Sequence, residues 1–148
     1  MTGIEIFEAN EHDIQGVLNL YMQPDIDNGL SLSIEQTKSI FSKMKTYPFY
    51  KLYTAKEGDL IVGTFTLAIL DNMAHLGSSS GLVEAVVVHE NYRSKGVGKQ
   101  MMEYAMERCR EAKCYKMSLS SNIKRERAHS FYERLGFKKH GYSFLIEL

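Results

Sequence analysis

The 148-residue chain carries 18 basic and 18 acidic residues, which gives a formal net charge of zero at neutral pH. This balance argues against a nucleic-acid or membrane-surface role that depends on bulk charge, so we expect neither partner. The hydrophobic content of 44% is ordinary for a globular protein, and this length suffices to bury a core without disulfides or metals. We therefore predict a single domain over residues 1–148.

Sorting and redox signals are weak in this sequence. The first residues contain no basic segment followed by an apolar one, and no window approaches about eighteen apolar residues. We therefore expect neither export nor membrane insertion, and we predict a cytoplasmic protein. Cys109 and Cys114 are too few for a disulfide framework and lack the CxxC spacing, so we expect reduced, partly buried thiols.

The N-terminal half predicts a strand, two helices and a hairpin. Residues 4–7 alternate like a short strand, and residues 13–22 carry apolar side chains at helical spacing. Ser33 and Gln36 have the spacing of a capping box for a second helix, which we expect to end near Thr46. The segments FYKLYTA and LIVGTFTLAIL are rich in aromatic and β-branched residues, and the glycine-containing turn between them favours an antiparallel hairpin.

The C-terminal half alternates strands and helices. In order, we predict a polar loop over residues 71–81, a strand over 82–88, a helix over 97–112, a strand over 115–121, a helix over 126–135 and a closing strand over 140–148. The central strand, helix and strand form one crossover unit. The whole pattern indicates a mixed α/β sheet with helices on its faces.

The turn between that strand and the following helix has a composition that suits an anion. It reads HENYRSKGVGKQ, and the N–H groups that open a helix are unpaired and lie at the positive end of its dipole. Gly96 and Gly98 would let the backbone approach a phosphate, and Arg93, Lys95 and Lys99 would add charged donors. Glycine turns before helices also serve packing alone. The spacing matches neither the Walker A loop nor the dinucleotide-binding fingerprint.

The pattern that does match is Arg-x-x-Gly-x-Gly, formed by Arg93, Gly96 and Gly98 after VEAVVV. Together with the later segment LSSNIKRERAHSFYERLGF, it resembles the coenzyme A motifs of the GCN5-related N-acetyltransferase superfamily. The resemblance covers roughly the C-terminal half, and the order of elements in the N-terminal half agrees with it. It implies an α/β (α+β) fold with a mixed, mostly antiparallel central sheet and helices on both faces, and acetyl-CoA as the cosubstrate.

The resemblance also implies which residues bind the cosubstrate. The phosphate loop would be formed by Arg93, Ser94, Lys95, Gly96, Val97, Gly98 and Lys99. The pantetheine arm would lie along the preceding strand and bond the main chain of Val86, Val87 and Val88, whose side chains are otherwise ordinary core residues. Asn122 takes the position that commonly contacts the coenzyme arm, although an Asn after a strand is also a frequent turn former.

Two residues are candidates for the chemistry. Tyr132 matches the family position that protonates the departing thiolate, and its place beside the apolar stripe of its helix would let the hydroxyl reach a cleft. The alternative is a tyrosine ring packed at a helix edge. Glu84 interrupts an apolar strand, and related enzymes often use a Glu there to take the proton of the amine. Substrate anchoring and a structural ion pair are the alternatives for Glu84.

The remaining polar candidates are weaker. His75 and His129 are secondary possibilities for acid-base work, and the five histidines show no metal-ligand spacing, so we predict no metal. Lys124, Arg125 and Arg127 form a basic run that would reach the coenzyme phosphates or would simply be a solvated loop.

The sequence therefore predicts an acetyl-CoA-dependent N-acetyltransferase that acts on a primary amine of a small molecule. Its motifs particularly resemble those of aminoalkylphosphonate-type N-acetyltransferases, but the acceptor contacts are expected elsewhere, from the N-terminal helices and the loop over residues 71–81. One alternative is acetylation of a protein N-terminus or lysine. Another is a noncatalytic acyl-CoA-binding regulatory module. Homodimers are frequent among related enzymes, so a homodimer is one candidate state.

Overall fold

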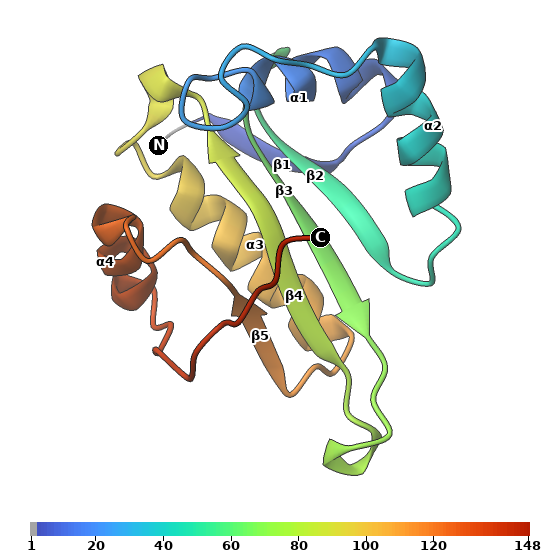
Figure 1. Ribbon diagram of the computed structural model, residues 1–148, viewed down its shortest axis with the longest axis vertical. Helices are drawn as coiled ribbons and strands as arrows, with labels where there is room; N and C mark the ends of the chain where they lie inside the picture. Colours follow the sequence, from blue (N-terminus) through green and yellow to red (C-terminus); the bar gives the residue numbers. More distant parts are fainter. Residues whose placement is uncertain (1–2) are drawn as a thin grey trace. The chain divides into compact units, whose positions relative to one another are not determined.

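A computed structural model describes residues 3–148 (Figure 1). The chain divides into two compact units, Met1–Ser118 and Leu119–Leu148. The first unit contains the glycine turn and Glu84, and the second contains Asn122 and Tyr132. The expectation that residues 1–148 form one domain stays a prediction. Within the described residues, no helix is long and apolar enough to span a membrane.

The centre of the fold is a five-stranded sheet. Its strands are β1 (Ile4–Glu8), β2 (Tyr50–Glu57), β3 (Leu60–Leu70), β4 (Ser80–Val88) and β5 (Lys116–Leu119), and they lie side by side in this order. The three pairs from β1 to β4 are antiparallel. Figure 1 shows β4 and β5 pointing the same way, as a strand, helix and strand crossover requires. The predicted mixed, mostly antiparallel sheet is therefore confirmed.

The helices begin and end close to the predicted positions. They are α1 (Ile14–Tyr21), α2 (Ile34–Met44), α3 (Val97–Glu111) and α4 (Glu126–Arg134), with short 3-10 turns η1 (Glu11–Asp13), η2 (His75–Gly77) and η3 (Glu90–Tyr92) between them. The predicted capping box opens α2: the backbone N–H of Gln36 donates to Ser33 Oγ, and the N–H of Ser33 donates to Gln36 Oε1, each at 3.1 Å. Local polar pairs of this kind are readable from sequence because both partners lie within one turn.

Helices cover both faces of the sheet. On one face, Leu52 of β2 packs in a buried cluster with Leu18 of α1 and Phe41 of α2. Ala55 lies three residues further along β2 and faces the opposite side of the sheet. Its neighbour on β3, Gly63, lies against Val97 and Met101 of α3 on that side. Alternation of side chains along a strand accounts for this division. On α3, the apolar residues at helical spacing Val97, Met101, Ala105 and Cys109 are likewise buried, whereas Ala112 at the end of the helix is exposed.

The two cysteines are free thiols, as expected. Cys109 is buried on α3 and Cys114 is half-buried. Burial raises the pKa of the Cys109 thiol to about 12, so this thiol stays protonated at neutral pH and behaves as a small apolar side chain.

Gly63 shows how tightly α3 packs on the sheet. A Cβ at this position would lie 2.8 Å from Met101 Sδ and 3.1 Å from Val97 Cγ1. We expect Gly63→Val to lower the free energy of unfolding by about 1–3 kcal/mol through overpacking. Urea unfolding would measure the change, with Gly141→Val as the matched control because no atom lies within 4 Å of a Cβ at Gly141. Equal stability of the two variants would contradict tight packing at Gly63.

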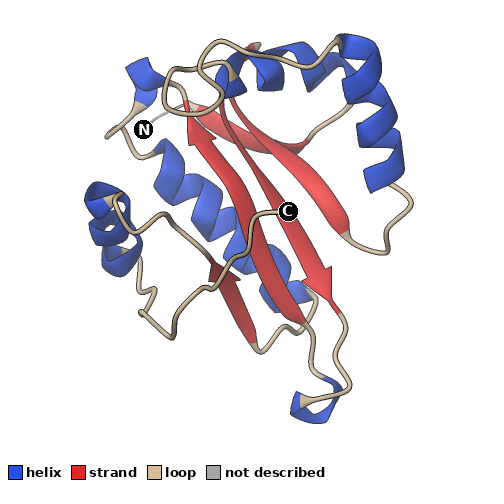
Figure 2. Cartoon of the chain, in the orientation of Figure 1, coloured by secondary structure: helices blue, strands red, loops and turns tan. Residues whose placement is uncertain are grey.

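The predicted closing strand over residues 140–148 is wrong. In the described structure these residues form no strand, and Figure 2 shows them as loop. Tyr142, Phe144, Leu145 and Ile146 are each more than four-fifths exposed. Their β-branched and aromatic composition suits a strand, but a strand also needs a partner ladder, and that depends on tertiary contacts that residue pattern does not supply.

Candidate active site

The glycine turn connects the end of β4 to the start of α3. Its backbone has positive φ at two residues, Ser94 at 60° and Gly96 at 86°. Gly96 is the N-cap of α3, and a Cβ there would meet open space, so the glycine is needed for its left-handed backbone rather than for close packing. This conformation reverses the chain and directs it into the helix.

The first turn of α3 has the features of an anion site. No side chain caps this helix end, and its first turn contains no acidic residue. Gly98 lies within this turn and does not have a positive φ, so the backbone conformation does not require a glycine there. Lys99 is exposed, and its Nζ lies 3.9 Å from Glu103 Oε1. The Lys95 ammonium lies 5.4 Å from the centre of the Tyr92 ring. Uncapped N–H groups, a glycine and two lysines together fit a pyrophosphate.

Tyr92 fixes the turn to the β2–β3 hairpin. Its hydroxyl donates a 2.6 Å hydrogen bond to the Glu57 carboxylate, and this bond raises the pKa of Tyr92. At the strand end, His89 Nδ1 accepts a hydrogen bond from the backbone N–H of Asn91 at 3.1 Å. No local residue pattern predicts the contact between Tyr92 and Glu57, because 35 residues separate them.

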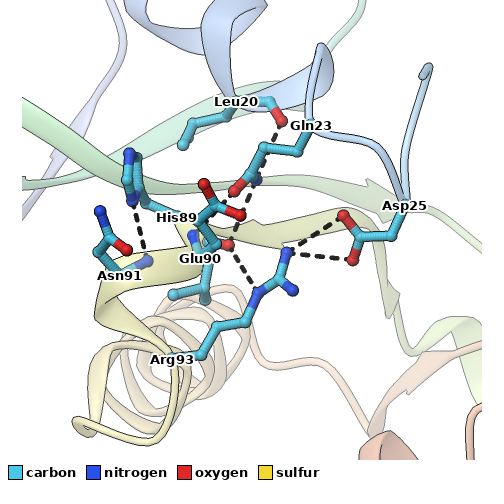
Figure 3. Close-up of polar contacts among 8 residues, drawn as sticks. Leu20, Gln23, Asp25, His89, Glu90, Asn91 and Arg93 are labelled. Atoms are coloured by element: carbon cyan, nitrogen blue, oxygen red, sulfur yellow. Dashed lines mark hydrogen bonds and ion pairs between the residues drawn. The ribbon is translucent and has the colours of Figure 1, made fainter. Parts of the chain in front are cut away.

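Arg93 makes two contacts within the first unit (Figure 3). Its Nε donates to the carbonyl oxygen of Val88 at 3.2 Å, and a terminal guanidinium nitrogen lies 3.0 Å from the Asp25 carboxylate. Gln23 also donates to the Val88 carbonyl, at 3.4 Å. A carbonyl oxygen has two lone pairs, so both are used at Val88, and its carbonyl is not available to a ligand in this arrangement.

A β-bulge interrupts β4 next to Glu84. Thr66 pairs with Glu84 and Thr64 with Val87, which leaves Ala85 and Val86 opposite the single residue between the two threonines. Ala85 has φ of 50°, an uncommon backbone conformation for a residue with a side chain. The bulge breaks the alternation of the strand, so Glu84 and Ala85 are both exposed. A disturbed ladder at this point leaves backbone groups of β4 available to a ligand.

Glu84 is exposed on β4, and its backbone carbonyl accepts a 3.1 Å hydrogen bond from Thr66 Oγ1. Among residues 3–148, the Glu84 carboxylate takes part in no ion pair or hydrogen bond. The alternative of a structural ion pair therefore has no partner in the described part of the chain. A solvated carboxylate remains able to accept a proton.

The second unit contains Asn122 and Tyr132. Asn122 Oδ1 accepts a hydrogen bond from the N–H of Lys124 at 2.9 Å, and a ring nitrogen of His129 lies 2.8 Å from the Asn122 carbonyl oxygen. Asn122 thus forms the turn that leads to α4, which is the alternative considered from its sequence context. This role engages Oδ1 and the backbone of Asn122.

Tyr132 lies on α4 and is half-buried. Its ring centre is 5.1 Å from that of Phe131 and 5.5 Å from that of Phe137. Burial raises the pKa of Tyr132 above 10, and Arg125 partly offsets this effect. The hydroxyl is consequently protonated at neutral pH, which is the state that a proton donor requires.

His75 lies in η2, where its ring stacks on Tyr115 with 4.4 Å between the ring centres. Within residues 3–148, no group of three or more His, Cys, Asp or Glu side chains is arranged to hold a metal ion. The secondary histidine candidates therefore have structural contacts in the described chain, His75 with Tyr115 and His129 with Asn122.

The model of the acetyltransferase (GNAT) family matches residues 14–137, most of the chain. The chain belongs to the GNAT family. It is 34% identical over 98 residues to a glucosamine 6-phosphate N-acetyltransferase of Trypanosoma brucei brucei. It is 33% identical over 84 residues to an aminoalkylphosphonate N-acetyltransferase of Salmonella typhimurium. These alignments cover 66% and 57% of this chain, and 65% and 54% of the relatives, so the chain spans less than two thirds of either curated relative.

A solved structure agrees with this chain over a longer stretch. A transcriptional regulator from Bacillus halodurans C-125 superimposes with a TM-score of 0.91 over 98% of this chain and 99% of that one, at 25% identity. The predicted membership of the GNAT superfamily is confirmed by the family match and by the two N-acetyltransferase relatives. The roles of the individual site residues of this GNAT chain remain predictions.

Proposed function

We propose that this chain transfers the acetyl group of acetyl-CoA to a primary amine of a small molecule. The observation that carries the proposal is the uncapped first turn of α3, which follows the left-handed Gly96 and contains Gly98. Unpaired backbone N–H groups lie there at the positive end of a 15-residue helix, where an anion would be stabilised. The pyrophosphate of coenzyme A is such an anion.

The proposal assigns the following residues to cosubstrate binding. Residues 94–99 would bind the pyrophosphate, Val86 and Val87 would offer backbone groups to the pantetheine arm, and Asn122 would take the family position that commonly contacts this arm. Acetyl-CoA supplies the acyl group as a thioester. No metal is assigned a role.

Glu84 and Tyr132 have complementary roles in the proposed chemistry. Glu84 accepts a proton, directly or through water, from the acceptor ammonium, since an amine with pKa near ~10 is mostly protonated at neutral pH. The neutral amine forms a C–N bond to the acetyl carbon as the C–S bond breaks. Tyr132 then donates its proton to the departing thiolate. Glu84 releases the first ammonium proton to solvent, and the second proton, which the nitrogen loses as the amide forms, restores the Tyr132 hydroxyl, so one turnover releases one proton in all.

The relatives support a set of acceptors to be tested. Their names describe two small amines, glucosamine 6-phosphate and aminoalkylphosphonates, and both carry a phosphorus oxyanion. We therefore include aminophosphonates and amino sugar phosphates among the acceptors to be tested. We also propose that the chain is one domain that works in the cytoplasm, without a nucleic-acid or membrane partner, with a homodimer as a candidate state.

Acetyl-CoA binding and turnover together test this proposal. At a hundredfold excess over its Kd, acetyl-CoA should raise the free energy of unfolding by about 2.7 kcal/mol. Thiol release should then be followed with amines, aminophosphonates, amino sugar phosphates, amino acids and peptides. We expect turnover with a small primary amine. Turnover with peptides alone would favour protein acetylation. Binding without any turnover would favour a regulatory module, for which the likeness to a transcriptional regulator is the supporting observation.

A further inference from the structure

Gln23 is a buried polar residue that the proposed chemistry does not use. It lies directly after α1, in the segment 22–33 that leads to α2. Its exposed fraction is only 9%, whereas every other residue of this segment is half-buried or exposed. Gln23 is therefore the buried polar contact of a segment that also packs through Ile26 against Leu20, Ile61 and Val87.

All polar atoms of the Gln23 side chain bridge two distant parts of the chain (Figure 3). Nε2 donates to the carbonyl of Leu20 at the end of α1, at 3.1 Å, and to the carbonyl of Val88 at the end of β4, at 3.4 Å. Oε1 accepts a 2.8 Å hydrogen bond from the N–H of Glu90, the first residue of η3. A primary amide has two N–H donors and one acceptor oxygen, and each of them is used here.

A second contact joins the same two parts. Asp25, two residues after Gln23, pairs with Arg93 at 3.0 Å, and Arg93 also donates to the Val88 carbonyl. The side chains of Arg93 and Asp25 are 45% and 47% exposed, and ion pairs this exposed contribute little energy. The buried amide of Gln23 is therefore the stronger of the two connections.

These contacts converge on the residues that enter the glycine turn. Val88 immediately precedes it, and Glu90 and Arg93 belong to it. On the other side, segment 22–33 holds itself together by turn hydrogen bonds such as Asp27 N–H to Tyr21 O, 2.9 Å, and Gly29 N–H to Met22 O, 2.8 Å. A ligand that orders the turn would thus also order segment 22–33 through Gln23.

We propose that Gln23 is a positioning residue that couples coenzyme binding at the glycine turn to the order of segment 22–33. The inference rests on the proposed function, since it requires that coenzyme A binds at the turn. Segment 22–33 connects the two N-terminal helices, from which we expect acceptor contacts. Its ordering by the coenzyme would make donor binding favour acceptor binding, and by linkage the reverse.

Hydrogen exchange with coenzyme A as the probe tests the coupling. The full chain is measured with and without saturating coenzyme A, in peptides that cover residues 22–33 and 90–99. In the wild type, we expect coenzyme A to slow exchange in both segments. In residues 22–33, the coupled segment, the exchange rate should fall by at least about fivefold. In Gln23→Met, which keeps the volume but removes the hydrogen bonds, coenzyme A should slow exchange in 90–99 only. Asp25→Asn should weaken the effect in 22–33 and, as an exposed substitution, preserve the fold.

Gln15→Met is the matched control. Gln15 lies on the exposed side of α1, and its side-chain amide donates to Asn19 Oδ1 one turn along the same helix, at 2.9 Å. In Gln15→Met, coenzyme A should slow exchange in residues 22–33 and 90–99 as it does in the wild type. If Gln23 were purely structural, Gln23→Met would speed exchange in residues 22–33 equally with and without coenzyme A. That result would overturn the coupling. Protection of 90–99 without 22–33 in the wild type would also overturn it. No protection in either segment would instead overturn the proposed coenzyme site, and the coupling with it.

Discussion

Tyr132→Phe is expected to lower kcat by about 10²–10⁴, the usual contribution of a general acid, with the Kd of acetyl-CoA changed by less than about twofold. The phenyl ring keeps the contacts with Phe131 and Phe137, so the variant should retain its fold. Only the proton that would go to the thiolate is lost. Steady-state rates of thiol release, together with a titration of acetyl-CoA, would separate the two quantities.

The pH dependence sharpens this prediction. Burial raises the pKa of Tyr132 above 10, so the protonated form that donates is present throughout neutral pH and is lost only as pH rises through this higher value. The wild-type kcat should therefore show no loss from Tyr132 between about pH 7 and 9, and the variant should be slower at every pH in that range. Equal activity of the two proteins at all pH values would remove Tyr132 from the mechanism.

The local parts of the fold could be predicted because their signals lie close together in sequence. The capping box of Ser33 and Gln36, the hairpin of β2 and β3 and the crossover through α3 each depend on periodicity or on residues within one turn. The closing strand was predicted wrongly because its residue pattern says nothing about a partner ladder. The β-bulge at Ala85 was also missed, since nothing in VEAVVV marks a positive φ.

The same division applies to the candidate site. The glycine turn was predictable because its residues are contiguous and its spacing is specific. Gln23 and Asp25 were not, since they contact the turn across more than sixty residues of sequence. Arg93 illustrates the difference: its charge predicted a phosphate ligand, whereas its guanidinium contacts Asp25 and the Val88 carbonyl. Its contribution to the site therefore includes holding the turn in place.

Gly98→Val should weaken acetyl-CoA binding by about 10- to 150-fold, while the free energy of unfolding stays the same or rises. Hydrogen bonds to charged groups contribute about 1.5–3 kcal/mol, and 1.4 kcal/mol corresponds to tenfold in affinity. A branched side chain in the first turn of α3 would keep the pyrophosphate away from the backbone N–H groups. Because Gly98 does not have a positive φ and valine is a better helix former than glycine, the helix itself should not suffer.

This opposition between affinity and stability distinguishes a ligand-binding glycine from a structural one. Gly96 would be a poor choice for the test, because its φ of 86° would strain any side chain and change both quantities together. Glu107→Val is the matched control, since it places the same side chain on an exposed position of α3 away from the turn. Calorimetric titration of acetyl-CoA and urea unfolding of the three proteins would decide the matter: unchanged affinity in Gly98→Val would mean that the turn serves packing alone.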